Sequence, residues 1–186
     1  MNEPHLHERR FNGNADRLRS PERMALLEVE HVVALSMEDV SLKSMLDVGT
    51  GTAIFAEAFF QQGLQVGGID TNPKLLEVAR RHVPSGDFRE ALAEAIPFED
   101  DSFDLVFLGH VLHETDDPLK ALQEARRVAK SRVVILEWPY REDAQAGPPM
   151  EHRLKPDFIK DIARKAGFLS VERIELQHMD YYRLTP

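Results

Sequence analysis

Short apolar runs alternate along this chain with segments in which apolar residues recur at helical spacing. From residue 42 onward, the runs predict strands at residues 44–48, 65–69, 88–91, 104–108 and 132–136, and two further strand-like runs at 170–177 and 181–185. The helical pattern predicts helices at residues 21–35, 53–60, 73–82, 118–129 and 156–166. Strands that alternate with helices are typical of a mostly parallel sheet. The predicted fold class is therefore α/β, with the last two runs forming an antiparallel hairpin.

Local signals mark where several of these helices begin and end. A polar residue that can cap a helix stands directly before proline at residues 20–21, 72–73 and 117–118. Gly63 and Gly167 follow two of the predicted helices, at the position where a left-handed residue commonly ends a helix. The polar segment 1–20 is predicted to be a loosely ordered arm, and residues 142–149 are predicted to form a loop.

Charge and composition exclude several classes of protein. The 186-residue chain carries 23 basic and 32 acidic residues, a formal net charge of −9, which repels nucleic acid. It has no cysteine, which excludes disulfides, thiolate metal ligands and cysteine nucleophiles. No apolar run is long enough to span a bilayer, and the charged N-terminal residues lack the apolar segment of a secretory signal. We therefore expect a cytoplasmic protein with no membrane span and no nucleic-acid partner.

Two glycines lie where the first predicted strand meets the next helix, in the sequence LDVGTGTAIF at residues 46–55. Glycine permits a positive φ and a close approach to a ligand, and the amides that open the helix face a negative group. Asp70 ends the next predicted strand, where a carboxylate can accept the hydroxyls of a ribose. A tight turn alone would also explain Gly49 and Gly51, and Asp70 could instead cap a helix. Taken together, the turn and the acid indicate a nucleoside site.

The spacing of the glycines distinguishes between nucleoside ligands. A dinucleotide fingerprint needs a third glycine where this chain has Ile54. The pattern Asp-x-Gly-x-Gly-x-Ala at residues 47–53 instead resembles motif I of the class I S-adenosylmethionine-dependent methyltransferases. Segments similar to that family follow in order: GGIDTNPKLLEVAR at 67–80, AEAIPFEDDSFDLVFLGHVLHETDDP at 93–118 and ALQEARRVAKSRVVILEW at 121–138. The resemblance covers residues 41–180 and is closest to the ubiquinone and menaquinone biosynthesis branch.

The resemblance implies a Rossmann-like, seven-stranded, mostly parallel sheet with helices on both faces, formed by residues 41–186. It also implies that an arm and a helix at residues 1–40 cover the cofactor site. The implied cofactor is S-adenosylmethionine, with S-adenosylhomocysteine as its product. The residues implied to bind it are Asp47, Gly49, Thr50, Gly51, Asp70, Thr71, Ala93, Glu94, Gly109 and His110. Two positions depart from the family pattern, because Ala53 replaces the third glycine and Leu92 stands where an acid often lies near the adenine.

Two histidines follow the fourth predicted strand, where this family contacts cofactor and substrate. His110 and His113 are candidate catalytic bases, because imidazole exchanges a proton near neutral pH. Their alternative role is to shape the wall of the pocket. We predict no metal site, because the order His-Glu-x-x-His is absent and no third ligand is evident. Trp138, after the fifth predicted strand, is a candidate to line an aromatic pocket.

The predicted function is transfer of a methyl group from S-adenosylmethionine to a small-molecule acceptor by in-line displacement. Residues 108–110 read Leu-Gly-His, unlike the Asn/Asp-Pro-Pro-Tyr of methyltransferases that act on amino groups of nucleic acids or proteins. The absence of cysteine excludes arsenite methylation. The alternative is a sensor or scaffold protein that binds the same cofactor on the same fold without catalysis. The sequence indicates neither the acceptor nor an oligomeric state.

Overall fold

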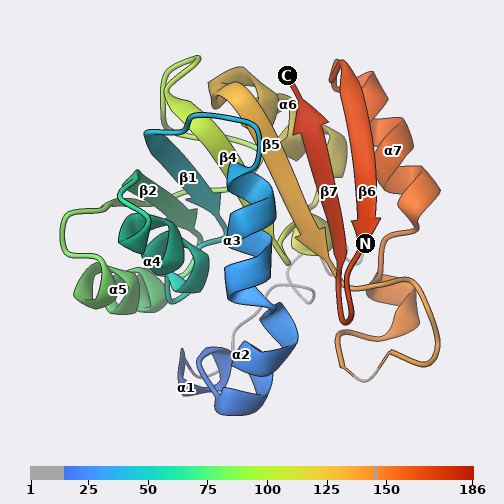
Figure 1. The fold of residues 1–186 in the computed structure, drawn as a ribbon, viewed down its shortest axis with the longest axis horizontal. Coiled ribbons are helices and arrows are strands. Elements are labelled where there is room, and N and C mark those ends of the chain that lie inside the picture. The colour runs from blue at the N-terminus through green and yellow to red at the C-terminus, as the bar shows by residue number, and fades with distance from the viewer. Residues whose placement is uncertain (1–14, 145) are drawn as a thin grey trace, which may run out of the picture.

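Seven strands and the helices between them make up the fold in the computed structural model, which describes residues 15–144 and 146–186 (Figure 1). The strands are β1 (Ser44–Val48), β2 (Gln65–Asp70), β3 (Asp87–Glu90), β4 (Phe103–Gly109), β5 (Ala129–Glu137), β6 (Ser170–Glu175) and β7 (Asp180–Thr185). They form one sheet in the order β3-β2-β1-β4-β5-β7-β6. The first five are parallel, and β7 is antiparallel to both β5 and β6. The predicted sheet and its terminal hairpin are confirmed.

Helices cover both faces of this sheet. The helices of the described residues are α1 (Ala15–Leu18), α2 (Pro21–Leu27), α3 (Val29–Met37), α4 (Ile54–Gln61), α5 (Pro73–His82), α6 (Pro118–Val128) and α7 (Pro156–Lys165), with short 3₁₀ helices at Leu112–Glu114 and Met150–His152. Helices α3, α4 and α5 pack on one face, and α6 and α7 pack on the other (Figure 1). None of the helices in the described ranges has the length and apolar character needed to cross a membrane.

The central strands send alternate side chains into two hydrophobic layers. In β4, Leu105 and Phe107 belong to the layer under α3, α4 and α5, whereas Val106 and Leu108 belong to the layer under α6 and α7. All four side chains are fully buried, as expected for a parallel strand covered on both faces. This packing holds the carboxyl ends of the parallel strands rigidly along one edge, and the loops at that edge are left to carry polar chemistry.

The predicted helix signals are present in the structure. The side chains of Ser20, Asn72 and Asp117 each accept a hydrogen bond from a backbone N–H in the first turn of α2, α5 and α6, respectively. Gly63 and Gly167 adopt positive φ angles of 89° and 93° beyond α4 and α7. These boundaries are confirmed because each depends on residues close together in the sequence.

For the N-terminal segment, one prediction is wrong and another is wrong at residues 15–18. The helix predicted at residues 21–35 is broken into α2 and α3, because Glu28 between them has a left-handed φ of 47°. The Glu28 carboxylate accepts the backbone N–H of His178 at 3.0 Å, a contact with the loop between β6 and β7 that local sequence does not reveal. The loose arm predicted at residues 1–20 contains the short helix α1, and its residues 1–14 lie outside the described part of the chain.

Candidate functional site

A cavity of about 630 Å³ opens at the carboxyl ends of β1, β2, β4 and β5. Strand β1 lies between β2 and β4, so the cavity occupies the switch point at which ligands commonly bind in doubly wound sheets. Side chains of α1 and α2 and residues 146–148 also line it. The cavity brings together every site residue named from the sequence: Asp47, Gly49, Thr50, Gly51, Asp70, Thr71, Ala93, Glu94, Gly109, His110 and His113.

The backbone between β1 and α4 turns through three residues with positive φ. Gly49, Gly51 and Ala53 have φ angles of 70°, 53° and 64°. A Cβ at position 49 would lie 2.6 Å from Cγ2 of Val111, so only glycine fits between this turn and the segment after β4. Ala53 adopts a left-handed conformation that glycine adopts without steric cost, which explains why a third glycine suits this position.

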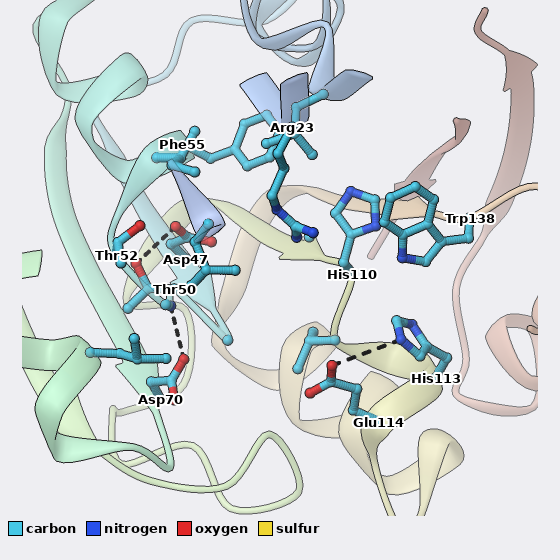
Figure 2. A pocket seen from close by; sticks show the side chains of 18 of the residues that line it. Arg23, Asp47, Thr50, Thr52, Phe55, Asp70, His110, His113, Glu114 and Trp138 are labelled. Carbon is cyan, nitrogen blue, oxygen red and sulfur yellow. Dashed lines mark hydrogen bonds and ion pairs between the residues drawn. The ribbon is translucent and has the colours of Figure 1, made fainter. Parts of the chain in front are cut away.

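Asp47 is a buried carboxylate that no basic side chain neutralises within the described ranges. It is 3% exposed and accepts a hydrogen bond from Oγ1 of Thr50 at 2.9 Å (Figure 2) and another from the backbone N–H of Ala56 at 3.3 Å. Burial raises the pKa of Asp47 to about 7, although both hydrogen bonds oppose the shift. A positive charge placed beside Asp47 would favour its ionised form, so this end of the cavity suits a cationic ligand.

Asp70 connects the end of β2 to the glycine turn. Its Oδ2 accepts the backbone N–H of Gly51 at 2.8 Å, and its Oδ1 accepts the backbone N–H of Asn72 at 2.8 Å. Burial raises the pKa of Asp70 against the effect of these hydrogen bonds. The residue that caps α5 is Asn72 rather than Asp70. The remaining lone pairs of the Asp70 carboxylate can therefore accept hydroxyl groups from a ligand.

Glu94 and Leu92 lie on the side of the cavity next to Asp70 in the fold. Oε1 of Glu94 accepts the backbone N–H groups of Asp116 and Asp117 at 2.8 and 3.3 Å. This carboxylate therefore holds the loop that leads into α6. Leu92 is 40% exposed and lines the cavity, which gives this wall an apolar surface where an acid was expected from the resemblance.

A second group of side chains lies at the ends of β4 and β5. His110 is 8% exposed, has a left-handed φ of 58°, and has no hydrogen-bond partner for either ring nitrogen within the described structure. Its ring centroid lies 4.7 Å from that of Trp138, and the Cζ of Arg23 lies 5.9 Å from the Trp138 ring (Figure 2). Burial lowers the pKa of His110 to about 3. His110 is therefore neutral at physiological pH and a weaker base than free imidazole.

His113 forms a buried ion pair with Glu137, the last residue of β5. Nδ1 of His113 lies 2.8 Å from Oε2 of Glu137, and the backbone N–H of His113 donates to Oε1 at 3.1 Å. Burial alone would lower the pKa of His113, but the charge and the hydrogen bond of Glu137 outweigh it and raise that pKa above its ordinary value. The pair likewise keeps the pKa of Glu137 below its ordinary value against the effect of burial. His113 is thus the stronger base of the two histidines.

Sequence reasoning missed two charged residues here, Arg23 and Glu137. The available signal for Glu137 is an acid placed directly after the continuous apolar run 133–136. Arg23 lies in the segment expected to cover the site, but no pattern distinguishes its side chain. In the part of the chain that the structure describes, no group of three or more His, Cys, Asp or Glu side chains could hold a metal ion.

Comparisons with known proteins agree with this geometry. The "Methyltransferase domain" family matches residues 46–136. The demethylmenaquinone methyltransferase of Renibacterium salmoninarum is 37% identical over 98 residues, 52% of this chain and 41% of that protein. The ubiquinone biosynthesis O-methyltransferase of Cereibacter sphaeroides is 27% identical over 151 residues, 69% of this chain and 61% of that protein. The matches thus span about half the length of these curated relatives.

A solved structure extends the likeness to nearly the whole fold. An S-adenosylmethionine-dependent methyltransferase of Aquifex aeolicus superposes with a TM-score of 0.79 at 25% identity, covering 91% of this chain and 95% of that one. The cavity fits the cofactor of this family, because Asp47 suits a cationic methionine end and Asp70 suits a ribose. Residues 46–136 thus match a methyltransferase domain, and the sheet order and the overall fold of this chain are similar to those of an S-adenosylmethionine-dependent methyltransferase.

Proposed function

We propose that this protein transfers a methyl group from S-adenosylmethionine to a small-molecule acceptor bound in the same cavity. The observation that carries the proposal is the pair of carboxylates on either side of the glycine turn, the buried Asp47 and the half-buried Asp70. One carboxylate lacks a basic partner among the described residues, and the other is held by the turn itself. These are the groups that a cationic nucleoside needs at its two ends.

The cofactor supplies a methyl group already activated by its sulfonium, so the protein's main task is alignment. Asp47 holds the positively charged methionine end, Asp70 accepts the ribose hydroxyls, and the backbone of Gly49 and Gly51 lets the ligand approach closely. Orientation of two reactants can contribute about 7–11 kcal/mol to a reaction of this kind. The side chains of α1 and α2 and residues 146–148 line the cavity and exclude water from the reacting atoms.

The acceptor that we propose is small and planar. The cavity of about 630 Å³ must hold the cofactor as well, which leaves space for a modest molecule. Trp138 offers an aromatic face at the end of the cavity near β5. The names of the relatives, which act in menaquinone and ubiquinone biosynthesis, support a quinol-like acceptor.

Titration calorimetry with S-adenosylmethionine, S-adenosylhomocysteine and NAD tests this proposal. We expect about micromolar binding of the first two, near −8 kcal/mol, and no binding of NAD. Failure to bind either sulfur compound would contradict the proposed function. Radiolabelled S-adenosylmethionine with a panel of hydroquinones and phenols then distinguishes catalysis from the sensor alternative, since a sensor binds the cofactor but labels no acceptor.

A further inference from the structure

The geometry points to a hydroxylated acceptor, a phenol or an enol, whose proton is taken by His113 while Glu137 positions that histidine and Arg23 attracts the resulting oxyanion. This inference rests on the proposed function and extends it to the reacting group of the acceptor and the residues that act on that group. In it, His113 is a catalytic base and Glu137 is a positioning residue.

The first observation is the fixed orientation of the His113 ring. Glu137 accepts from both the backbone N–H and the Nδ1 side of His113, and it is 2% exposed, so water does not compete for these contacts. A carboxylate on Nδ1 fixes the tautomer in which Nε2 is free to accept a proton. In the described residues no hydrogen bond reaches Nε2, and Oε1 of Glu114 lies 3.9 Å from it, beyond hydrogen-bond distance. His113 lines the cavity, so a bound acceptor can reach this nitrogen.

The second observation is a buried cationic donor nearby, Arg23, whose charge is partly offset by that of Glu114. Nε of Arg23 is buried and has no hydrogen-bond partner within the described ranges, and the guanidinium lies 5.9 Å from the ring of Trp138. His110, beside it in Figure 2, is buried with both ring nitrogens unpartnered. Buried polar groups normally have partners, so these atoms mark a place for a polar ligand group.

The charge pattern selects between classes of acceptor. An amine acceptor is protonated at neutral pH and has no lone pair with which to accept from the unpartnered Nε–H of Arg23. A carboxylate acceptor is already ionised and needs no base. A phenol or enol arrives neutral, loses a proton to His113 and develops the negative charge that Arg23 attracts, so this class uses both features of the site.

The step balances without a further reactant. The acceptor oxygen gives its proton to Nε2 of His113 and forms a bond to the methyl carbon. The carbon–sulfur bond breaks and its electron pair remains on sulfur, so a sulfonium becomes a neutral thioether. His113 then carries the proton as an imidazolium paired with Glu137, and it releases the proton to water after the methyl ether leaves.

Several charged groups face His113 and set its protonation. Glu137 from β5 and the adjacent Glu114 favour the protonated ring, whereas Arg23 from α2 disfavours it. The neutral ring of His110 contributes no charge near neutral pH. Replacing Glu137 with a neutral residue is therefore expected to lower the pKa of His113, which makes it a weaker base. The replacement should also leave the His113 ring less well oriented.

A chromophoric phenol tests the inference directly. We would titrate 4-nitrophenol, which absorbs visible light when ionised, into the S-adenosylhomocysteine complex near pH 6. We expect the wild-type protein to bind the phenol as its phenolate, and His113→Gln to reduce the bound phenolate about 100-fold. We expect Glu137→Gln to reduce it about tenfold, with partial recovery in Glu137→Asp. Added imidazole should restore ionisation in His113→Ala.

Asp180→Asn is the matched control. Asp180 is the cross-strand partner of Glu137 on β7 and is also buried, but it pairs with Arg173 and does not line the cavity. This variant should keep the phenolate signal. Circular dichroism and S-adenosylhomocysteine affinity check that each variant folds.

A rate comparison separates base catalysis from a structural role. For methyl transfer to 4-nitrophenol and to the less acidic 4-methoxyphenol, loss of the base should slow the second reaction about tenfold more than the first. Equal losses for both phenols, or phenolate binding that survives in His113→Gln, would overturn the inference. So would a wild-type complex that binds S-adenosylhomocysteine but no phenol. If S-adenosylhomocysteine itself does not bind, the proposed function fails instead.

Discussion

Lowering the pH from 7 to 5.5 is expected to weaken the binding of S-adenosylmethionine about fifteenfold, because Asp47 takes up a proton. Burial raises the pKa of Asp47 to about 7. About half of the ligand-free molecules then carry the negative charge at pH 7, and about 3% carry it at pH 5.5. The cationic methionine end is attracted only by the ionised carboxylate, so affinity follows the ionised fraction. The pH range of the experiment stops at 7 because the α-amino group of the ligand begins to lose its own proton near pH ~7.7–8.0.

Calorimetric titrations at several pH values across this range measure the effect. Adenosine is the matched ligand, since it reaches Asp70 through its ribose but has no methionine end, and its pH dependence reports Asp70 alone. In Asp47→Asn we expect a lower affinity for S-adenosylmethionine at pH 7. The affinity of this variant should depend on pH no more steeply than the affinity of the wild type for adenosine. A flat affinity in the wild-type protein, or the same slope in Asp47→Asn, would refute the role of Asp47.

The same titration has a consequence for the stability of the ligand-free protein. The folded-state pKa of Asp47 lies above the ordinary value of 3.8, so its proton stabilises the fold fully below that value, and this stabilisation is lost as the pH rises through about 7. The span between the two pKa values corresponds to roughly 4 kcal/mol as an upper bound. Asp47→Asn should therefore be more stable than the wild type to urea at pH 8. If the difference in unfolding free energy between Asp47→Asn and the wild type is the same at pH 5 and at pH 8, the assigned pKa is contradicted.

Three further substitutions test the site and the core. Asp70→Ala should weaken S-adenosylmethionine binding by about 1.5–3 kcal/mol through loss of charged hydrogen bonds, and unchanged affinity in calorimetry would remove its ribose role. Gly51→Val places a β-branched residue at a φ of 53°, so binding should be lost while circular dichroism is kept; retained binding would place the cofactor elsewhere. Phe107→Ala removes a fully buried ring that packs on Phe55 and Phe59, and urea unfolding should show a loss of about 3–5 kcal/mol.

Local sequence signals predicted most of the fold, because strands and helix starts depend on neighbouring residues. The caps at Asn72 and Asp117 each act within three residues of their own position. The break at Glu28 could not be predicted in this way. Its left-handed φ is accompanied by a hydrogen bond to the backbone of His178, which is 150 residues away in the sequence. Local helical spacing continues across the break and gives no sign of it.

The candidate site was predictable where it depends on a continuous motif and not where it depends on strand order. The glycine turn and Asp70 follow from the spacing of one β-α-β unit. The pair of His113 and Glu137 forms because β4 and β5 are neighbours, which brings the segment after β4 to the end of β5. Arg23 reaches the same region from α2, and only its place in the folded chain shows that its Nε lacks a hydrogen-bond partner among the described residues.

The two ends of the cavity differ in their charged groups, and this difference suits the proposed reaction. Asp47 and Asp70 make the end near β1 and β2 negative, whereas the end near β4 and β5 holds the guanidinium of Arg23, with Glu114 beside it. A positively charged methyl donor and a developing oxyanion would each lie beside a group of opposite sign before they react. Methyl transfer removes the positive charge on sulfur and the negative charge on the acceptor oxygen. Arg23 therefore attracts the developing oxyanion more strongly than the neutral methyl ether, as a group that stabilises the transition state should.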